Sequence, residues 1–208
     1  METEEKIKNI LDRCLDLFYQ YGIRSLSMDD ISQRLGISKK TLYQFFTNKE
    51  DLVRHVIEHL SARHREKYGS VASEPGNAID KLLRASMMAC EEMRYYNPVM
   101  TFDLHKYHPD IIEGHVKREK EFFREKILEN LVQGIEEGLY RPELNKELVA
   151  TLYVSNLAEL HRLDEVLAQK ITFHDIFQVL FDNYIRGIST PAGIAYYENE
   201  LSKIMKIS

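Results

Sequence analysis

Residues 27–50 constrain the fold more than any other part of this 208-residue chain, because they place two short helices around a tight turn. Ser27 stands three residues before Asp30, which is the spacing of a capping box and predicts the start of a helix. Gly36 predicts the end of that helix, since glycine adopts the left-handed backbone of a C′ position. Ser38 is placed to cap a second helix. The stretch therefore predicts a helix, a three-residue turn and another helix.

A longer helix is predicted to follow from about residue 49, because Thr47 and Glu50 repeat the capping-box spacing. Its free N–H groups, with Lys49 in the first turn, predict a place for a phosphate. The apolar residues of the two short helices and their turn share one inner surface: Ile31, Leu35, Ile37, Leu42 and Phe46. An apolar stripe over about residues 4–21 predicts the scaffold helix that covers this surface.

The second short helix carries a polar face. Lys40, Tyr43 and Gln44 follow the i, i+3, i+4 spacing and so share one side, with Lys39 and Thr41 flanking it. Lysine and glutamine reach base edges in the major groove, while tyrosine, threonine and lysine reach phosphates. This face therefore predicts a helix that reads DNA.

Local charge indicates the same partner. Residues 24–50 carry five cations and three anions, a balance of +2, whereas the whole chain has a net charge of −5. A polyanion is therefore expected at this part of the molecule. The alternative is that a few lysines on a short helix form an ordinary solvated surface. The helix caps, the turn, the buried positions and the local charge all fit the residue spacing of one helix-turn-helix. This agreement favours DNA binding.

The run from Gly22 to Leu52 resembles the N-terminal domain of TetR-family transcriptional regulators. The resemblance rests on Tyr-Gly, Ser-Met-Asp-Asp-Ile, Leu-Gly-Ile-Ser-Lys-Lys-Thr-Leu-Tyr-Gln-Phe-Phe and Asn-Lys-Glu-Asp-Leu. It covers about the first 55 residues and implies a symmetric dimer that binds a palindromic operator, usually represses, and releases DNA when a small molecule binds. Met28 departs from the small polar residue that the family often has there. With the two cap serines included, the candidate DNA-binding residues are Ser27, Ser38, Lys39, Lys40, Thr41, Tyr43, Gln44 and Lys49.

An all-α fold of about nine to ten helices is predicted. Residues 1–48 form the three-helix helix-turn-helix DNA-binding domain, 49–68 a connecting helix, and 69–208 a larger helical ligand-binding and dimerisation domain. The boundary is placed at 69–77, where small residues, proline and glycine break the apolar pattern. Apolar stripes predict the later helices at about 78–96, 98–106, 109–139, 146–168, 173–188 and 194–207.

The helices at about 146–168 and 173–188 carry unusually wide apolar stripes. A helix that is apolar over more than one face has two surfaces to pack against, and a second subunit supplies the second one. The resemblance also implies a four-helix bundle across a dimer axis at this helix pair. A homodimer is therefore expected, and the alternative is a wider monomer core.

The resemblance places a ligand pocket among the helices of residues 78–168. Aromatic, methionine and a few polar side chains there suit a medium-sized, mainly apolar effector, although most of them fit a plain core equally well. The candidates are Met87, Glu91, Met93, Tyr95, Tyr96, Phe102, His105, Phe123, Tyr153, Asn156 and Glu159.

Other chemistries find little support. A metal site is considered at three histidines, His105, His108 and His115, because imidazole is a ligand of first-row metals. A proline follows His108, and the spacing of the three residues fits no compact pair on one helix. No metal is therefore expected. The chain has no nucleophile elbow, glycine-rich phosphate loop or paired metal motif, so neither an enzyme nor a cofactor is expected. Cys14 and Cys90 are predicted to be buried thiols, with a redox switch as the alternative.

Composition, with 44% apolar and 29% charged residues, is that of a globular protein. No secretory signal and no apolar run near about 18 residues is present, so a cytoplasmic protein that does not enter membranes is expected. The function predicted is a ligand-responsive DNA-binding repressor, released from a palindromic operator by a small molecule. The alternatives are a DNA-binding protein whose second domain binds another protein or no ligand, and a helical interaction module that does not bind DNA.

Overall fold

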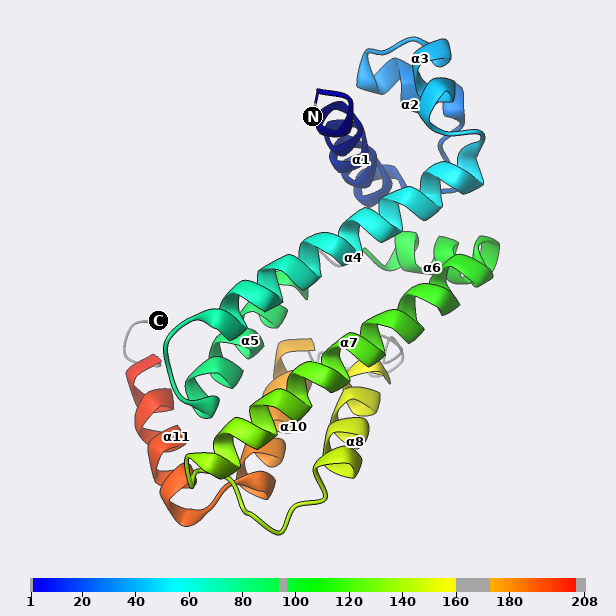
Figure 1. Ribbon diagram of the computed structural model, residues 1–208. Helices are drawn as coiled ribbons and strands as arrows, with labels where there is room; N and C mark the ends of the chain where they lie inside the picture. The colour runs from blue at the N-terminus through cyan, green and yellow to red at the C-terminus, as the bar shows by residue number, and fades with distance from the viewer. Residues whose placement is uncertain (1, 94–96, 160–172, 205–208) are drawn as a thin grey trace. The chain divides into compact units, whose positions relative to one another are not determined.

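The computed structural model of the protein describes residues 2–93, 97–159 and 173–204, and these form ten α-helices without a β-strand (Figure 1). The all-α prediction is therefore confirmed. Over the same ranges, no helix is both long enough and apolar enough to span a bilayer. The helices are α1 Glu2–Tyr21, α2 Met28–Leu35, α3 Lys39–Phe45, α4 Lys49–Ser73, α5 Ala78–Met93, α6 Pro98–Tyr107, α7 Pro109–Glu136, α8 Lys146–Glu159, α10 Phe173–Ile188 and α11 Pro191–Ile204.

The chain forms two compact units. Met1–Glu66 and Tyr95–Glu119 make up the first, which we call the head unit. Lys67–Arg94 and Lys120–Ser208 make up the second, which we call the body unit. Helices α4 and α7 contribute residues to both units. The division into domains at residues 48 and 68 stays a prediction.

The core of the head unit joins the first four helices to α6 and the start of α7. Phe18 of α1, Leu42 of α3 and Leu52 of α4 are fully buried in one apolar cluster. Met100 and Leu104 of α6 belong to the same cluster. A three-helix head is small for independent folding, and this extra apolar area enlarges its core.

Two details of α4 differ from the sequence-based expectation. Its N-cap is Asn48, whose Oδ1 accepts the Asp51 N–H at 2.9 Å, whereas Thr47 and Glu50 were predicted as the capping pair. The helix also runs to Ser73, past the predicted end near residue 68. In its last turn the Ser73 hydroxyl donates to the carbonyl of Gly69, four residues earlier, at 2.8 Å.

The body unit packs α5 against α10 and α11. Its cluster of buried residues includes Ile79 of α5, Leu131 of α7 and Ile185 of α10. The connections after α7 and α10 are tied together by backbone hydrogen bonds, among them Thr190 N–H to the Leu139 carbonyl at 2.9 Å. These hydrogen bonds hold the C-terminal ends of α7 and α10 next to each other.

The two cysteines differ in burial, and neither forms a disulfide. Cys14 is fully buried in the head core, and burial raises the pKa of its thiol to about 12. Cys90 is half-buried. The buried-thiol prediction is thus confirmed for Cys14.

We expect one of the two thiols to react with a disulfide reagent in the native protein at about pH 8. Thiolate is the reactive form, and both burial and the raised pKa keep Cys14 protonated. Cys90 should label first, and Cys14 only after unfolding in denaturant. The measurement is the count of released chromophore with and without denaturant, and a Cys90→Ser variant should lose the native signal. Rapid labelling of Cys14 in that variant would contradict the burial.

Candidate nucleic-acid interface

Local hydrogen bonds fix the geometry of α2, the turn and α3. The Ser27 hydroxyl accepts the Asp30 N–H at 3.1 Å, and the Asp30 carboxylate accepts the Ser27 N–H at 2.9 Å. Gly36 adopts φ +70°, and the following Ile37 N–H donates to the Ser32 carbonyl at 3.0 Å. The predicted capping box and left-handed glycine are both confirmed. The Ser27 hydroxyl is engaged in its own cap.

Helix α3 turns its polar face to solvent. At its start the Ser38 hydroxyl accepts the Thr41 N–H at 3.0 Å. Leu42 is buried, whereas Lys40, Tyr43 and Gln44 are exposed, with 49% of Tyr43 accessible. The predicted inner and outer faces of α3 are thus confirmed, and whether the outer face contacts DNA stays a prediction.

The lysines near this face differ in their surroundings. Lys39 Nζ lies 2.5 Å from Asp29 Oδ2, and both side chains are exposed, so the pair is weak and a phosphate can replace the carboxylate. Among the described residues, Lys40 has no ion-pair partner within 4 Å. Lys40 is therefore the more available cation of α3.

Lys49 sits in a more crowded place than the sequence suggested. It is half-buried; burial lowers the pKa of its ammonium, and the nearby charges of Asp103 and Asp30 oppose that shift. The start of α4 also carries its own carboxylate, because Asp51 Oδ2 accepts the Thr47 N–H at 2.8 Å. This bond is the main reason that the pKa of Asp51 is lowered. The α4 N-terminus is therefore less open to a phosphate than predicted.

Helix α6 supports the head from a distant part of the sequence. Asp103 is buried, and its Oδ2 accepts the backbone N–H of Arg24 at 2.8 Å. The Arg24 guanidinium lies 4.7 Å from the ring centre of Tyr107 and donates to its hydroxyl. The Asn97 side-chain amide donates to the Tyr19 carbonyl. This support is not predictable from the sequence, because partners such as Arg24 and Asp103, 79 positions apart, leave no local signal.

The candidate pocket residues fall in different places. Phe102 and His105 are exposed on α6 of the head unit. In the body unit, Met87, Glu91, Asn156 and Glu159 are exposed, Phe123 is half-buried and Tyr153 is buried. The Met93 side chain, Tyr95 and Tyr96 lie outside the described residues. Their role as a pocket stays a prediction.

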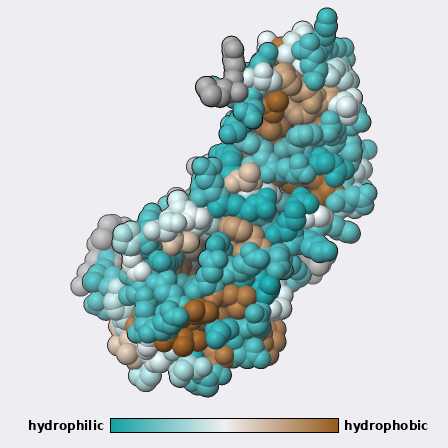
Figure 2. Space-filling model, viewed as in Figure 1, coloured by the Kyte–Doolittle hydropathy of each residue, from teal (hydrophilic) through white to brown (hydrophobic). Residues whose placement is uncertain are grey.

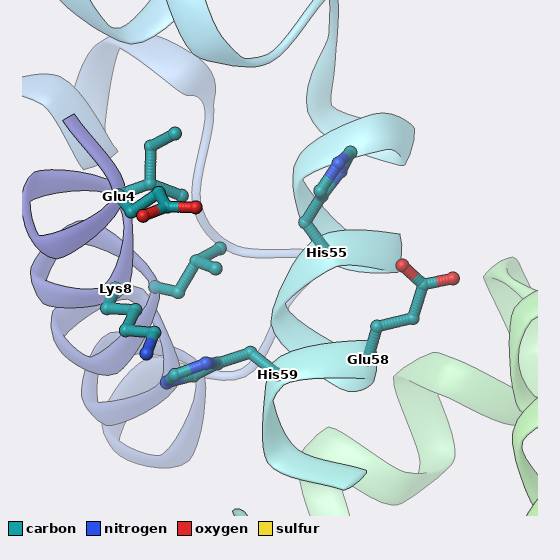
Figure 3. Close-up of a pocket in the computed structure, with 7 residues that line it drawn as sticks. Glu4, Lys8, His55, Glu58 and His59 are labelled. Carbon is teal, nitrogen blue, oxygen red and sulfur yellow. The ribbon is translucent and has the colours of Figure 1, made fainter. Parts of the chain in front are cut away.

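The described residues line a surface groove in each unit. The head groove, of about 300 Å³, lies between α1 and α4 and is lined by Glu4, Ile7, Lys8, Leu11, His55, Glu58 and His59 (Figure 3). His59 Nε2 lies 2.9 Å from Asp12 Oδ1, so this histidine already has a partner. The body groove, of about 210 Å³, is lined by Asp80, Leu83, Arg84, Met87 and Glu200. Of the candidate pocket residues, Met87 borders one of these grooves.

Two of the three histidines considered for a metal have protein partners, and the third, His105, is exposed. His108 Nδ1 lies 2.6 Å from Glu50 Oε2, and His115 Nδ1 lies 2.7 Å from the Ser61 hydroxyl. Within the described ranges, no three His, Cys, Asp or Glu side chains are grouped so as to hold a metal ion.

Residues 10–56 match the family model "Bacterial regulatory proteins, tetR family". The chain is 24% identical to the uncharacterized HTH-type transcriptional regulator YvaF of Bacillus subtilis, over 88% of this chain and 95% of that protein. It is 28% identical to the HTH-type transcriptional repressor KstR2 of Mycobacterium tuberculosis, over 67% of this chain and 72% of that protein.

Solved structures share the fold. A TetR/AcrR-family regulator from Thermobifida fusca superposes with a TM-score of 0.69 at 17% identity, covering 88% of this chain and 98% of that one. The structure of KstR2 of Mycobacterium tuberculosis, titled a ketosteroid transcriptional regulator, gives a TM-score of 0.55 at 21% identity, covering 88% and 94%.

Proposed function

Since this chain belongs to the TetR family of transcriptional regulators, we propose that it is a ligand-responsive dimeric repressor of the cytoplasm. It binds a palindromic operator and leaves it when a small, mainly apolar molecule binds the body unit. It has no enzymatic activity and needs no cofactor. The observation that carries this proposal is the solvent-exposed polar face of α3, held by capped helix ends on a buried apolar base.

In the proposed complex α3 lies in the major groove. Gln44 is placed for base edges, and Lys40 and Tyr43 with the Ser38 and Thr41 hydroxyls are placed for phosphates. Lys39 reaches a phosphate after exchanging its partner Asp29. Lys49 contributes mainly through its charge, because it is half-buried, and Ser27 holds α2 in place.

Exposed apolar side chains on the body unit support the proposed dimer. Leu148 and Leu152 lie one turn apart on α8 and are 54% and 55% exposed, and Val179 of α10 is 62% exposed. The opposite side of α8 buries Tyr153 and Val154 in the body core. Figure 2 shows an apolar area on the part of this unit where α7, α8 and α10 lie. A second copy packing on α8 and α10 would cover these side chains.

The apolar interior of the body unit supports an apolar effector. Phe123 packs edge to face with Tyr68 at 4.8 Å between ring centres, and Tyr153 stacks on Tyr184. The solved relative KstR2 is titled a ketosteroid regulator, and a ketosteroid is an apolar molecule. We therefore keep the candidate pocket residues of the body unit as proposed contacts, with Phe123 and Tyr153 as the central ones.

A second candidate function is that the body unit binds another protein instead of a small molecule. The shallow body groove, of about 210 Å³, favours this alternative over an open chamber. Native mass spectrometry of the purified protein separates the two. A small bound molecule supports the repressor with an effector, whereas a bare chain that binds no member of a metabolite library supports the alternative.

The DNA-binding face is tested with a duplex that the parent protein selects from a random library. Lys40→Ala should weaken binding and lower the slope of log affinity against log salt by about 0.9 per copy, because one phosphate contact is lost. Tyr43→Phe should weaken binding and leave the slope unchanged, because an uncharged hydroxyl releases no counterion. Fluorescence anisotropy over a salt series gives both quantities.

Lys203→Ala is the matched control, because it removes an exposed lysine of α11 in the body unit. It should leave both the affinity and the slope at the parental values. If Lys40→Ala kept the parental slope as well, the outer face of α3 would not be the DNA-binding surface.

A further inference from the structure

The hydroxyl of Tyr184 on α10 is, with Ser189 Oγ and Arg84 Nε, one of three buried polar side-chain atoms in the described part of the body unit that have no hydrogen-bond partner. Its oxygen is inaccessible to solvent, and among the described residues it has no hydrogen-bond partner. Other tyrosines of this unit have acceptors: Tyr140 donates to Asn130 Oδ1 at 3.1 Å, Tyr196 to Asp80 Oδ1 at 2.9 Å, and Tyr197 to Asp182 Oδ1 at 3.2 Å. Buried polar groups are nearly always paired, so the unpaired hydroxyl needs an explanation.

A flat aromatic surface adjoins this hydroxyl. The rings of Tyr184 and of Tyr153 on α8 are stacked, with 3.8 Å between their centres and 20° between their planes. Partly buried apolar side chains pack against the same core cluster as Tyr153 and Tyr184, among them Phe123, Leu157 and Leu180. A ligand beside this pair would meet apolar side chains and the unpaired Tyr184 hydroxyl, and mainly apolar walls with a few polar groups are typical of a small-molecule site.

The groups around the two hydroxyls disfavour a negatively charged ligand. Besides burial, the titratable groups among the described residues that raise the pKa of the Tyr184 hydroxyl are the phenols of Tyr140 and Tyr153. For the Tyr153 hydroxyl the corresponding group is the thiol of Cys90. None of these groups is a cation. An anion would lose its hydration there without a counter-charge. Burial raises the pKa of Tyr184 well above its ordinary value, so its hydroxyl remains a protonated donor.

We propose that the effector binds beside the stacked pair of Tyr153 and Tyr184 as a neutral, mainly apolar molecule whose carbonyl or ether oxygen accepts the hydrogen bond of the Tyr184 hydroxyl. This inference rests on the proposed ligand response and adds to it the donor residue and the chemical class of the ligand. The candidate pocket residues include Tyr153 but not Tyr184, because the family resemblance places the pocket among the helices of residues 78–168.

The test uses matched pairs of probes that differ in the acceptor oxygen. Acetophenone is compared with ethylbenzene, and 2-acetylnaphthalene with 2-ethylnaphthalene, by titration calorimetry on the full chain. In the parent protein at least one ketone should bind about tenfold more tightly than its hydrocarbon, which is the upper end of the gain from one neutral hydrogen bond. Tyr184→Phe should abolish that preference and leave hydrocarbon binding unchanged. If neither ketone is preferred by the parent, or if Tyr184→Phe keeps the preference, the inference is overturned.

Tyr197→Phe is the control, because its hydroxyl has an acceptor in Asp182. It should keep the ketone preference and lower the melting temperature, whereas Tyr184→Phe should keep or raise the melting temperature because no hydrogen bond is lost. A fall for Tyr184→Phe equal to that of the control would reveal an internal partner and overturn the inference.

Operator affinity measured in the same samples separates this inference from the proposed function. A Tyr184-dependent ketone preference without DNA release supports the site and contradicts the ligand response. Ketone-driven DNA release that is equal in the parent and in Tyr184→Phe supports the ligand response and overturns the site.

Discussion

Replacing Gly134 with alanine is expected to lower the free energy of unfolding by about 3 kcal/mol, which is the cost of a strongly overpacked core. A Cβ at this position of α7 would lie 2.0 Å from Cδ2 and 2.3 Å from Cε2 of Tyr140. Tyr140 cannot move aside easily. Its ring is fully buried, its hydroxyl donates to Asn130, and its backbone N–H donates to the Gly134 carbonyl at 2.9 Å.

Gly69→Ala is the matched control, because a Cβ at this position of α4 would meet nothing within 4 Å. That change should stabilise the protein by about 0.5–1 kcal/mol through the better helix propensity of alanine. Urea unfolding followed by circular dichroism measures both variants against the parent. Equal stability of Gly134→Ala and the parent would mean that α7 and Tyr140 do not pack as closely as described.

Most features of the helix-turn-helix whose partners lie within four residues were predictable from the sequence. The cap of α2 by Ser27, the left-handed Gly36 and the cap of α3 by Ser38 each depend on hydrogen bonds inside one turn of chain. The polar face of α3 followed from the same register, because helical periodicity fixes which side chains point away from Leu42. These local rules determine the shape of the candidate DNA-binding face.

Features that depend on distant partners were not predictable in this way. Asp103 was noted only as a neighbour of the histidines, and nothing in the sequence indicates that its carboxylate accepts the Arg24 N–H. One local feature was also wrong: the N-cap of α4 was predicted at Thr47 because two capping patterns overlap there, and Asn48 is the residue that accepts the Asp51 N–H. Apolar spacing likewise does not distinguish a residue that lines a ligand pocket from one that lies in the core. Phe102 and Tyr153 were both candidate pocket residues, yet Phe102 is exposed and Tyr153 is buried.

The proposed dimer predicts the other large effect. Leu148→Asp combined with Leu152→Asp should leave a folded monomer whose operator affinity is lower by about 100-fold or more. Both side chains are more than half exposed on α8, so the charges do not disturb the body core but would be buried unpaired at a subunit contact. Two linked DNA-binding heads gain affinity because the second head binds at a high effective concentration, and a monomer loses that gain.

Analytical ultracentrifugation measures the assembly state, and anisotropy with the selected duplex measures the affinity. Ala195→Asp combined with Ser202→Asp adds the same charge to exposed positions of α11 and should remain dimeric, with operator affinity lowered only by the added negative charge. The comparison matters because added anions repel DNA wherever they are placed, whereas loss of the dimer requires the α8 surface. A dimeric Leu148→Asp, Leu152→Asp variant would place the subunit contact elsewhere. A parent protein that binds the duplex as a monomer would remove the need for a palindromic operator.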